Sequence, residues 1–270
     1  MTLAVALLGA RVRYGPLEAL HGVDLPVPAG RLTVLLGRNG AGRSTALHAL
    51  AGAVPLTGGR VQWYGEGGGG GEGSGREGGG GSVGAGAPRD ITALSAYARA
   101  RLGLTLVPAE GAVFPSLSVA DHLSGLTAQG RAAALDVFPE LRRLLTRSAG
   151  TLSGGEQQML ALGVALSRRS RVLLLDEPGR GLAPAVLERV HAAVASAVAA
   201  GRTVVLAEQS LPSAPTAVVD LVHVLHRGSV VFSGEPDEPA LGMWLSSGVS
   251  AIAAPSQRPD GRGRVRRRPG

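Results

Sequence analysis

The chain has 270 residues, no cysteine and a formal net charge of +7. The lack of cysteine excludes a disulfide framework and a thiolate metal site. No apolar run approaches the roughly 20 residues that a membrane-spanning helix needs. Six arginines and one aspartate give residues 251–270 a charge of +5, so the rest of the chain is nearly balanced; all the basic residues are arginines.

Taken in chain order, the sequence predicts alternating strands and helices. The N-terminal segment is apolar but lacks a basic leading region, which favours a first strand over a signal peptide. The predicted strands are residues 31–37, 101–108, 171–178 and 202–209, and the predicted helices are residues 43–54, 154–170 and 183–201. Apolar strands that alternate with helices indicate a parallel sheet covered on both faces. Residues 221–234 then predict a hairpin that turns at Arg227 and Gly228.

Two segments have little to bury. Glycine dominates residues 67–88, which predicts a flexible insertion. The end of the chain is rich in proline, glycine and arginine and predicts a disordered tail. Such a tail could attract anionic lipid or nucleic acid; a solvated extension is the favoured interpretation, because a basic patch alone is weak evidence.

The stretch GRNGAGRST at residues 37–45 matches the phosphate-loop pattern G-x-x-x-x-G-K-[ST] except that Arg43 stands at the lysine. It follows a predicted strand and opens a predicted helix, as a phosphate loop requires. Its glycines let successive backbone N–H groups point inward, and the helix N-terminus adds positive potential. Ser44 is placed to hold Mg²⁺ through its hydroxyl. The alternative is an ordinary glycine-rich turn.

A buried strand ends in two carboxylates in VLLLDEP, residues 172–178. Asp176 could hold Mg²⁺, and Glu177 could orient or deprotonate an attacking water. The alternative is a pair of acids at a helix N-terminus.

A third motif, TLSGGEQQML, occupies residues 151–160. Ser153 and two glycines would stand at the start of a helix, where exposed N–H groups form a second anion site. The alternative is a capping box between Ser153 and Glu156.

In this order and spacing the three motifs resemble the nucleotide-binding domain of ATP-binding cassette (ABC) ATPases, over about residues 3–238. The stretches VFPSLSVADHL and LAEQS, together with GLAP after the carboxylates, resemble the branched-chain amino acid transporter subgroup. The resemblance implies an α/β P-loop NTPase fold: a mostly parallel sheet flanked by helices, with an antiparallel β subdomain. It implies an ABC ATPase domain at 1–240, with a short helical subdomain at 115–150, and a C-terminal helix with the basic tail at 241–270.

The resemblance also implies ATP and Mg²⁺ as cofactors. The implied ATP-binding residues are Tyr14, Gly37, Asn39, Gly40, Ala41, Gly42, Arg43, Ser44, Thr45, Ser153, Gly154 and Gly155. Ser44 and Asp176 would support Mg²⁺, with Glu177 as general base and Gln209 at the switch position. Tyr14 would stack on adenine; alternatively it is a half-buried strand tyrosine. Gln209 can donate a hydrogen bond but cannot take a proton; alternatively it is a strand-end glutamine without a role.

In this family the signature residues 153–155 close over the ATP of a partner subunit, so a head-to-tail homodimer or heterodimer is implied. The implied function is an ATP-hydrolysing subunit, peripheral on the cytoplasmic face of the cell membrane. It would power import of branched-chain or related amino acids through separate permease subunits, served indirectly by an extracytoplasmic binding protein.

The sequence departs from the family pattern at several places. Arg43 replaces lysine, Ala109 stands at the usual glutamine with Glu110 after it, and Gly179 and Arg180 replace the expected Ser-Leu. These departures favour an alternative in which the subunit binds ATP but hydrolyses it slowly and acts as a regulator. A soluble, non-transport ABC ATPase acting on nucleic acid is disfavoured, because such proteins typically carry two cassettes and this chain has one.

Overall fold

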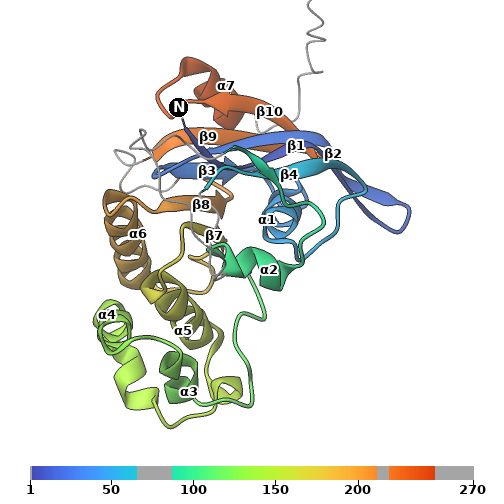
Figure 1. Ribbon diagram of the computed structural model, residues 1–270. Coiled ribbons are helices and arrows are strands. Elements are labelled where there is room, and N and C mark those ends of the chain that lie inside the picture. The colour runs from blue at the N-terminus through green and yellow to red at the C-terminus, as the bar shows by residue number, and fades with distance from the viewer. Residues whose placement is uncertain (1, 66–86, 212–218, 247–270) are drawn as a thin grey trace, which may run out of the picture.

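The computed structural model describes residues 2–65, 87–211 and 219–246. Nearly all of the glycine-rich 67–88 segment and the tail beyond 246 therefore lie outside the described residues. Within the described ranges the strands form two sheets, with helices packed against them (Figure 1).

The larger sheet has six strands in the order β10-β9-β3-β8-β7-β6. Its strands are β3 (Leu32–Leu36), β6 (Leu104–Val107), β7 (Val172–Asp176), β8 (Thr203–Glu208), β9 (Val219–His226) and β10 (Ser229–Gly234). Neighbours pair in parallel except β10, which runs antiparallel to β9. The predicted, mostly parallel sheet is confirmed, and the buried apolar runs of β3 and β7 form its centre.

The smaller sheet is antiparallel, with the order β2-β1-β4-β5. Its strands are β1 (Leu3–Tyr14), β2 (Leu17–Pro28), β4 (Gly58–Trp63) and β5 (Arg89–Asp90). The prediction of a first strand at the N-terminus is confirmed. The sheet corresponds to the antiparallel β subdomain that the resemblance implied.

The two faces of the larger sheet are covered by different helices. Helix α1 (Arg43–Ala51) lies in a core shared with the smaller sheet, where Leu47 and Leu50 pack with Leu174 of β7. Helices α5 (Gly154–Ser167) and α6 (Pro184–Ala199) pack in the second core, against the side of β7 that carries Leu173 and Leu175. Adjacent residues of β7 thus face opposite cores, as the pleat of a strand dictates.

A helical region extends away from the sheets at the far end of α5 (Figure 1). It contains α3 (Val119–Ser124), α4 (Ala128–Val137) and the 3₁₀ turns η1 (Pro139–Leu144) and η2 (Ala149–Thr151). The remaining helices are α2 (Ala96–Arg101), which lies before β6, and α7 (Pro239–Ser246). The C-terminal helix begins before the boundary expected at 240/241, because Pro239 can occupy the first turn of a helix without losing a hydrogen bond.

The described ranges contain no helix that is both long and apolar enough to cross a membrane.

The hairpin between β9 and β10 turns at the predicted residues. Arg227 and Gly228 have φ angles of 46° and 75°, which is the left-handed pair of a type I′ turn. A Cβ at Gly228 would lie 2.6 Å from the carbonyl oxygen of Ala19, so only glycine fits. The Gly228 N–H donates to the Ala41 carbonyl at 2.9 Å, and its own carbonyl accepts from His21 N–H at 2.8 Å. The turn therefore joins β2 to the loop that precedes α1.

Candidate nucleotide site

The loop between β3 and α1 has the backbone shape that its glycines predict. Gly40 and Gly42 have φ angles of 77° and 106°, and Gly42 is the N-cap of α1. A Cβ on Gly42 would lie 2.9 Å from Leu20 Cδ2 and 3.0 Å from the Ala19 carbonyl oxygen. The loop is therefore packed closely against β2. The first turn of any helix leaves N–H groups without partners inside the helix, and those of α1 begin at this loop. This is the strand–loop–helix arrangement that the motif predicts.

A pocket of about 550 Å³ lies over this loop. It is lined by Tyr14, Leu17, Ala19, Arg38, Asn39, Gly40, Ala41, Gly42, Arg43, Ser44, Thr45, Ala109, Glu177, Arg180 and Gln209. Most of the candidate ATP-binding residues are thus brought together. Gly37 is not among the lining residues: a Cβ there would lie 2.6 Å from the Leu225 carbonyl oxygen, so this glycine serves packing against β9. Leu17, Ala19 and Arg38 also line the pocket and were not predicted from the sequence; their spacing from Tyr14 and from the motif was the available signal.

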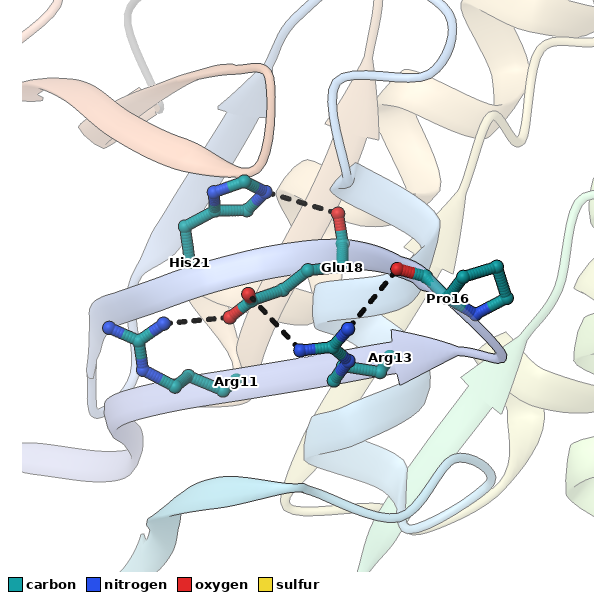
Figure 2. A network of polar contacts seen from close by, with 5 residues as sticks. All are labelled: Arg11, Arg13, Pro16, Glu18 and His21. Atoms are coloured by element: carbon teal, nitrogen blue, oxygen red, sulfur yellow. Dashed lines mark hydrogen bonds and ion pairs between the residues drawn. The ribbon is translucent and has the colours of Figure 1, made fainter.

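Tyr14 reaches the pocket from the end of the β1–β2 hairpin, and its side chain is half exposed. Figure 2 shows the polar contacts around this end of the hairpin. Glu18 accepts from Arg11 Nη1 at 2.7 Å, and Arg13 Nη2 donates to the Pro16 carbonyl at 3.2 Å. The hydrogen bond from Arg11 holds the pKa of Glu18 below its ordinary value. These exposed contacts are individually weak. The backbone pairing of β1 with β2, in which Tyr14 lies opposite Leu17, sets the position of Tyr14.

Asp176 is the last residue of β7 and is almost fully buried. Burial raises its pKa above the ordinary value, while a hydrogen bond from the Ser44 hydroxyl acts in the opposite direction. Its Oδ1 is buried and, among the residues that the structure describes, has no hydrogen-bond partner. A buried carboxylate oxygen left unpaired beside a serine hydroxyl fits a hard cation such as Mg²⁺.

Glu177 follows β7 in the left-handed region, with φ 43°. Arg43 Nη2 donates to its Oε1 at 2.6 Å, and Gln209 Nε2 donates to the same oxygen at 3.1 Å. Burial acts to raise the pKa of Glu177, but the hydrogen bonds from Gln209 and Arg43 outweigh it and hold the pKa below the ordinary value. The alternative that Asp176 and Glu177 cap a helix is wrong, because the next helix begins at Pro184.

Arg43 points inward, with 5% of its side chain exposed. Besides Glu177, its Nη2 has a long contact of 3.4 Å with Asn39 Oδ1. Its Nη1 is buried and lacks a hydrogen-bond partner in the described part of the chain. A buried guanidinium nitrogen without an acceptor, beside a glycine-rich loop, fits a phosphate oxygen.

Ser153 is the N-cap of α5, and the predicted capping box with Glu156 is present. Gly154 and Gly155 do not line the 550 Å³ pocket; they line a separate pocket of about 280 Å³ together with Glu110 and Arg180. The fold therefore does not bring residues 153–155 to the phosphate loop of their own chain.

Two of the departures from the family pattern meet across the site. Arg180 Nη1 lies 2.7 Å from Glu110 Oε1, which links the loop after β6 to the loop after β7. Both side chains are exposed. Ala109 lines the 550 Å³ pocket, whereas Glu110 does not.

A glycine-rich loop beneath an α/β pocket, a buried strand-end carboxylate and a capped SGGEQ helix define an ATP-binding cassette. The chain belongs to the ABC transporter family, whose sequence model matches residues 20–180.

The curated relatives are ATP-binding subunits of transport systems. The high-affinity branched-chain amino acid transport ATP-binding protein BraG of Pseudomonas aeruginosa is 32% identical over 226 residues, which cover 81% of this chain and 87% of the relative. The probable branched-chain amino acid transport ATP-binding protein LivF of Archaeoglobus fulgidus is 33% identical over 234 residues, or 83% and 89% of the two chains. The resemblance to the branched-chain subgroup is confirmed, and the chain is an ABC transporter ATP-binding subunit.

Solved structures support the fold. An ATP-binding cassette of an ABC transporter in its ADP conformation superposes with a TM-score of 0.69 at 20% identity, covering 92% of this chain and 97% of the other. A nucleotide-free ATP-binding cassette gives a TM-score of 0.68 at 20% identity, with coverage of 90% and 95%.

Proposed function

We propose that the chain binds ATP with Mg²⁺ in the 550 Å³ pocket and hydrolyses it to power the import of branched-chain or related amino acids. The observation that carries the proposal is a pair of buried polar atoms beside the phosphate loop, Arg43 Nη1 and Asp176 Oδ1, which have no hydrogen-bond partner among the described residues. One is a donor and the other an acceptor, which matches a phosphate oxygen and its cation.

The residues of the pocket take separate roles in this proposal. Tyr14 stacks on the adenine, and the N–H groups of residues 40–45 hold the phosphates. Ser44 and Asp176 hold Mg²⁺, which supplies neutralisation of phosphate charge when bound. Glu177 accepts the proton of the attacking water, and Gln209 orients that carboxylate through the hydrogen bond of 3.1 Å.

Residues 153–155 lie away from the chain's own phosphate loop, which supports a head-to-tail dimer in which they close over the partner's ATP. Such a dimer is either homomeric or formed with a related subunit. The remaining partners are permease subunits, served by an extracytoplasmic substrate-binding protein, with this chain peripheral on the cytoplasmic face. Residues 1–240 form the ATPase domain, with 115–150 as its helical subdomain.

The branched-chain substrate class is proposed from BraG and LivF. Relatives named as Fe(3+) ions import proteins reach 32% identity over 73% of this chain, so the cassette alone does not choose the cargo. A second candidate function is a regulatory subunit that binds ATP and turns it over slowly. The contact of 2.6 Å between Arg43 and Glu177 favours it, because it occupies the carboxylate that would serve as base.

Purified protein titrated with Mg²⁺ and ATP, followed by a turnover assay, tests the proposal. Tyr14→Ala is expected to weaken ATP binding about tenfold, since loss of one stacking contact costs on the order of 1–3 kcal/mol. Tyr97→Ala is the matched control, because Tyr97 lies exposed on α2 and does not line the pocket. Equal losses in both variants would contradict the assigned pocket.

Glu177→Gln tests the dimer. With ATP bound and hydrolysis blocked, the variant is expected to elute as a dimer in size-exclusion chromatography with ATP and as a monomer with ADP. A variant that stays monomeric with ATP contradicts the proposed mechanism.

A further inference from the structure

Arg43 Nη2 lies 2.6 Å from Glu177 Oε1 in the pocket, although 134 positions separate the two residues in the chain. The side chains are 5% and 17% exposed, so water screens their attraction poorly. The contact uses only one end of the guanidinium: Nη2 donates to Glu177, and Nη1 has no partner in the ranges described. Arg43, which is proposed to bind a phosphate, is therefore already paired with Glu177, which is proposed to accept the proton of the attacking water.

We infer that the Arg43–Glu177 ion pair is an autoinhibitory contact, in which Glu177 competes with the nucleotide's β-phosphate for Arg43 and becomes free to act as base only when the phosphate takes its place. The inference deepens the proposed function and rests on it. It predicts that the chain without nucleotide holds its own general base inactive.

The planar guanidinium accounts for how a phosphate can approach Arg43 before it displaces Glu177. Its nitrogens are fixed in a fork, so one end can hold a carboxylate while the other faces an incoming phosphate. A lysine ammonium is a single compact point charge and has no second end. Arginine at position 43, where the motif has lysine, can thus contact an incoming phosphate before it releases Glu177.

The charges around Arg43 favour the contact. Asp176 and Glu208 interact electrostatically with Arg43 in addition to Glu177. Removal of Arg43 would take a positive charge away from the buried Asp176 and the half-buried Glu177 and Glu208, which is unfavourable. An ATP or ADP phosphate that enters must therefore replace the Glu177 carboxylate as the negatively charged partner of Arg43.

The first experiment examines the ion pair without nucleotide, by thermal unfolding of Arg43→Gln, Glu177→Gln and the double variant. Breaking a largely buried pair from one side leaves an unpaired charge, so Arg43→Gln is expected to lower Tm by about 6 °C or more. The double variant is expected to recover at least half of that loss. Strictly additive shifts would overturn the inference, whatever the protein does with nucleotides.

The second experiment measures ADP affinity, since ADP carries the β-phosphate but is not expected to close the dimer. Glu177→Gln is expected to tighten ADP binding about tenfold in the Arg43 chain and much less in the Arg43→Gln background. AMP, which lacks the β-phosphate, is expected to bind all variants equally. An AMP gain that matches the ADP gain would overturn the inference.

Glu208→Gln is the matched control for the loss of one negative charge near the pocket. Burial raises the pKa of Glu208 to about 7, so titrations at pH 8 keep its carboxylate ionised. Its removal is expected to change ADP affinity less than threefold. An equal gain in Glu177→Gln and Glu208→Gln refutes the competition. If no variant binds ADP while the unfolding shifts are non-additive, the ion pair stands and the proposed nucleotide function fails.

Discussion

Arg99 of α2 donates two hydrogen bonds to the C-terminal end of α1, at 2.7 Å to the Ala49 carbonyl and 2.8 Å to the Leu50 carbonyl. Its other nitrogens donate to the carbonyls of Leu94 and Thr92, and the side chain is almost fully buried. One guanidinium thus binds two carbonyls of the last turn of α1, where helix carbonyls lack the usual partner four residues on. The helix that begins at the phosphate loop is anchored at its opposite end.

Arg99→Met is expected to lower the free energy of unfolding by about 2–4 kcal/mol, because four carbonyls, two of them in buried hydrogen bonds, lose a charged donor. Chemical denaturation measures the loss. Arg101→Met is the control, since Arg101 is an exposed arginine on the same helix and surface substitutions usually stay within about 0.5 kcal/mol. Equal effects in the two variants would contradict the anchoring role.

The two signature glycines differ in the space beside them. A Cβ on Gly155 would lie 2.8 Å from the Gly181 carbonyl oxygen, whereas one on Gly154 would have nothing within 4 Å. Gly155→Ala is expected to destabilise the chain by about 1–3 kcal/mol, because backbone must move to make room. Gly154→Ala is expected to leave the stability unchanged or slightly raised. Urea unfolding of the two variants measures the change. A larger loss of unfolding free energy in Gly154→Ala than in Gly155→Ala would contradict the prediction and would show that the loop at Gly181 moves without cost.

Arg43→Lys is expected to raise ATP turnover by about ten- to a hundredfold. The compact ammonium restores the family's phosphate contact and loosens the hold on Glu177, and misplacement by about 1 Å in such a site costs on the order of a hundredfold. Steady-state phosphate release measures the change. Arg142→Lys makes the same replacement at an exposed site paired with Asp136 and should leave the rate as it was. Equal turnover by Arg43→Lys and the parent chain would contradict the prediction that Arg43 slows hydrolysis.

Stability is expected to fall in acid because of His223. Its ring is fully buried, with Nδ1 2.8 Å from Ser233 Oγ and Nε2 3.2 Å from the Pro26 carbonyl oxygen. Burial lowers the pKa from 6.5 to about 4, so folding favours the neutral ring. The stabilisation from keeping this ring neutral is fully present above pH 6.5. As the pH falls from 6.5 toward 4, the unfolded chain takes up a proton first and the free energy of unfolding falls by about 3 kcal/mol.

His223→Gln is the comparison for that measurement, since glutamine keeps a donor and an acceptor but does not titrate. The variant is expected to be less stable at pH 8, with a flatter dependence between pH 6.5 and 4. If the difference in unfolding free energy between parent and variant is constant over that range, His223 does not titrate on unfolding.

The sequence predicted the larger sheet well because its strands are continuous apolar runs. Parallel strands that are buried on both faces, such as β3 and β7, are apolar at nearly every position, so they are easily recognised in the sequence. Strands β4 and β5 were not predicted: β4 mixes exposed and buried residues, and β5 has only the two residues Arg89 and Asp90. Their pairing depends on partners distant in the chain.

Part of the candidate site was likewise predicted from the sequence and part was not. The phosphate loop was predictable because glycine spacing and the adjoining helix are local features. The Arg43–Glu177 contact was not, because it depends on the order of strands: β3 and β7 both neighbour β8, which brings their C-terminal ends together. Spacing in the sequence carries no information on which strand inserts between two others.

Gly228 provides a reporter outside the pocket, because its N–H donates to the Ala41 carbonyl and its carbonyl accepts from the His21 N–H. Its amide proton can exchange with deuterium only when the turn separates from the carbonyl of the phosphate loop. A nucleotide that rigidifies the loop should slow this exchange although it touches neither Arg227 nor Gly228. The exchange rate at this one amide would report nucleotide occupancy in the intact chain without any substitution.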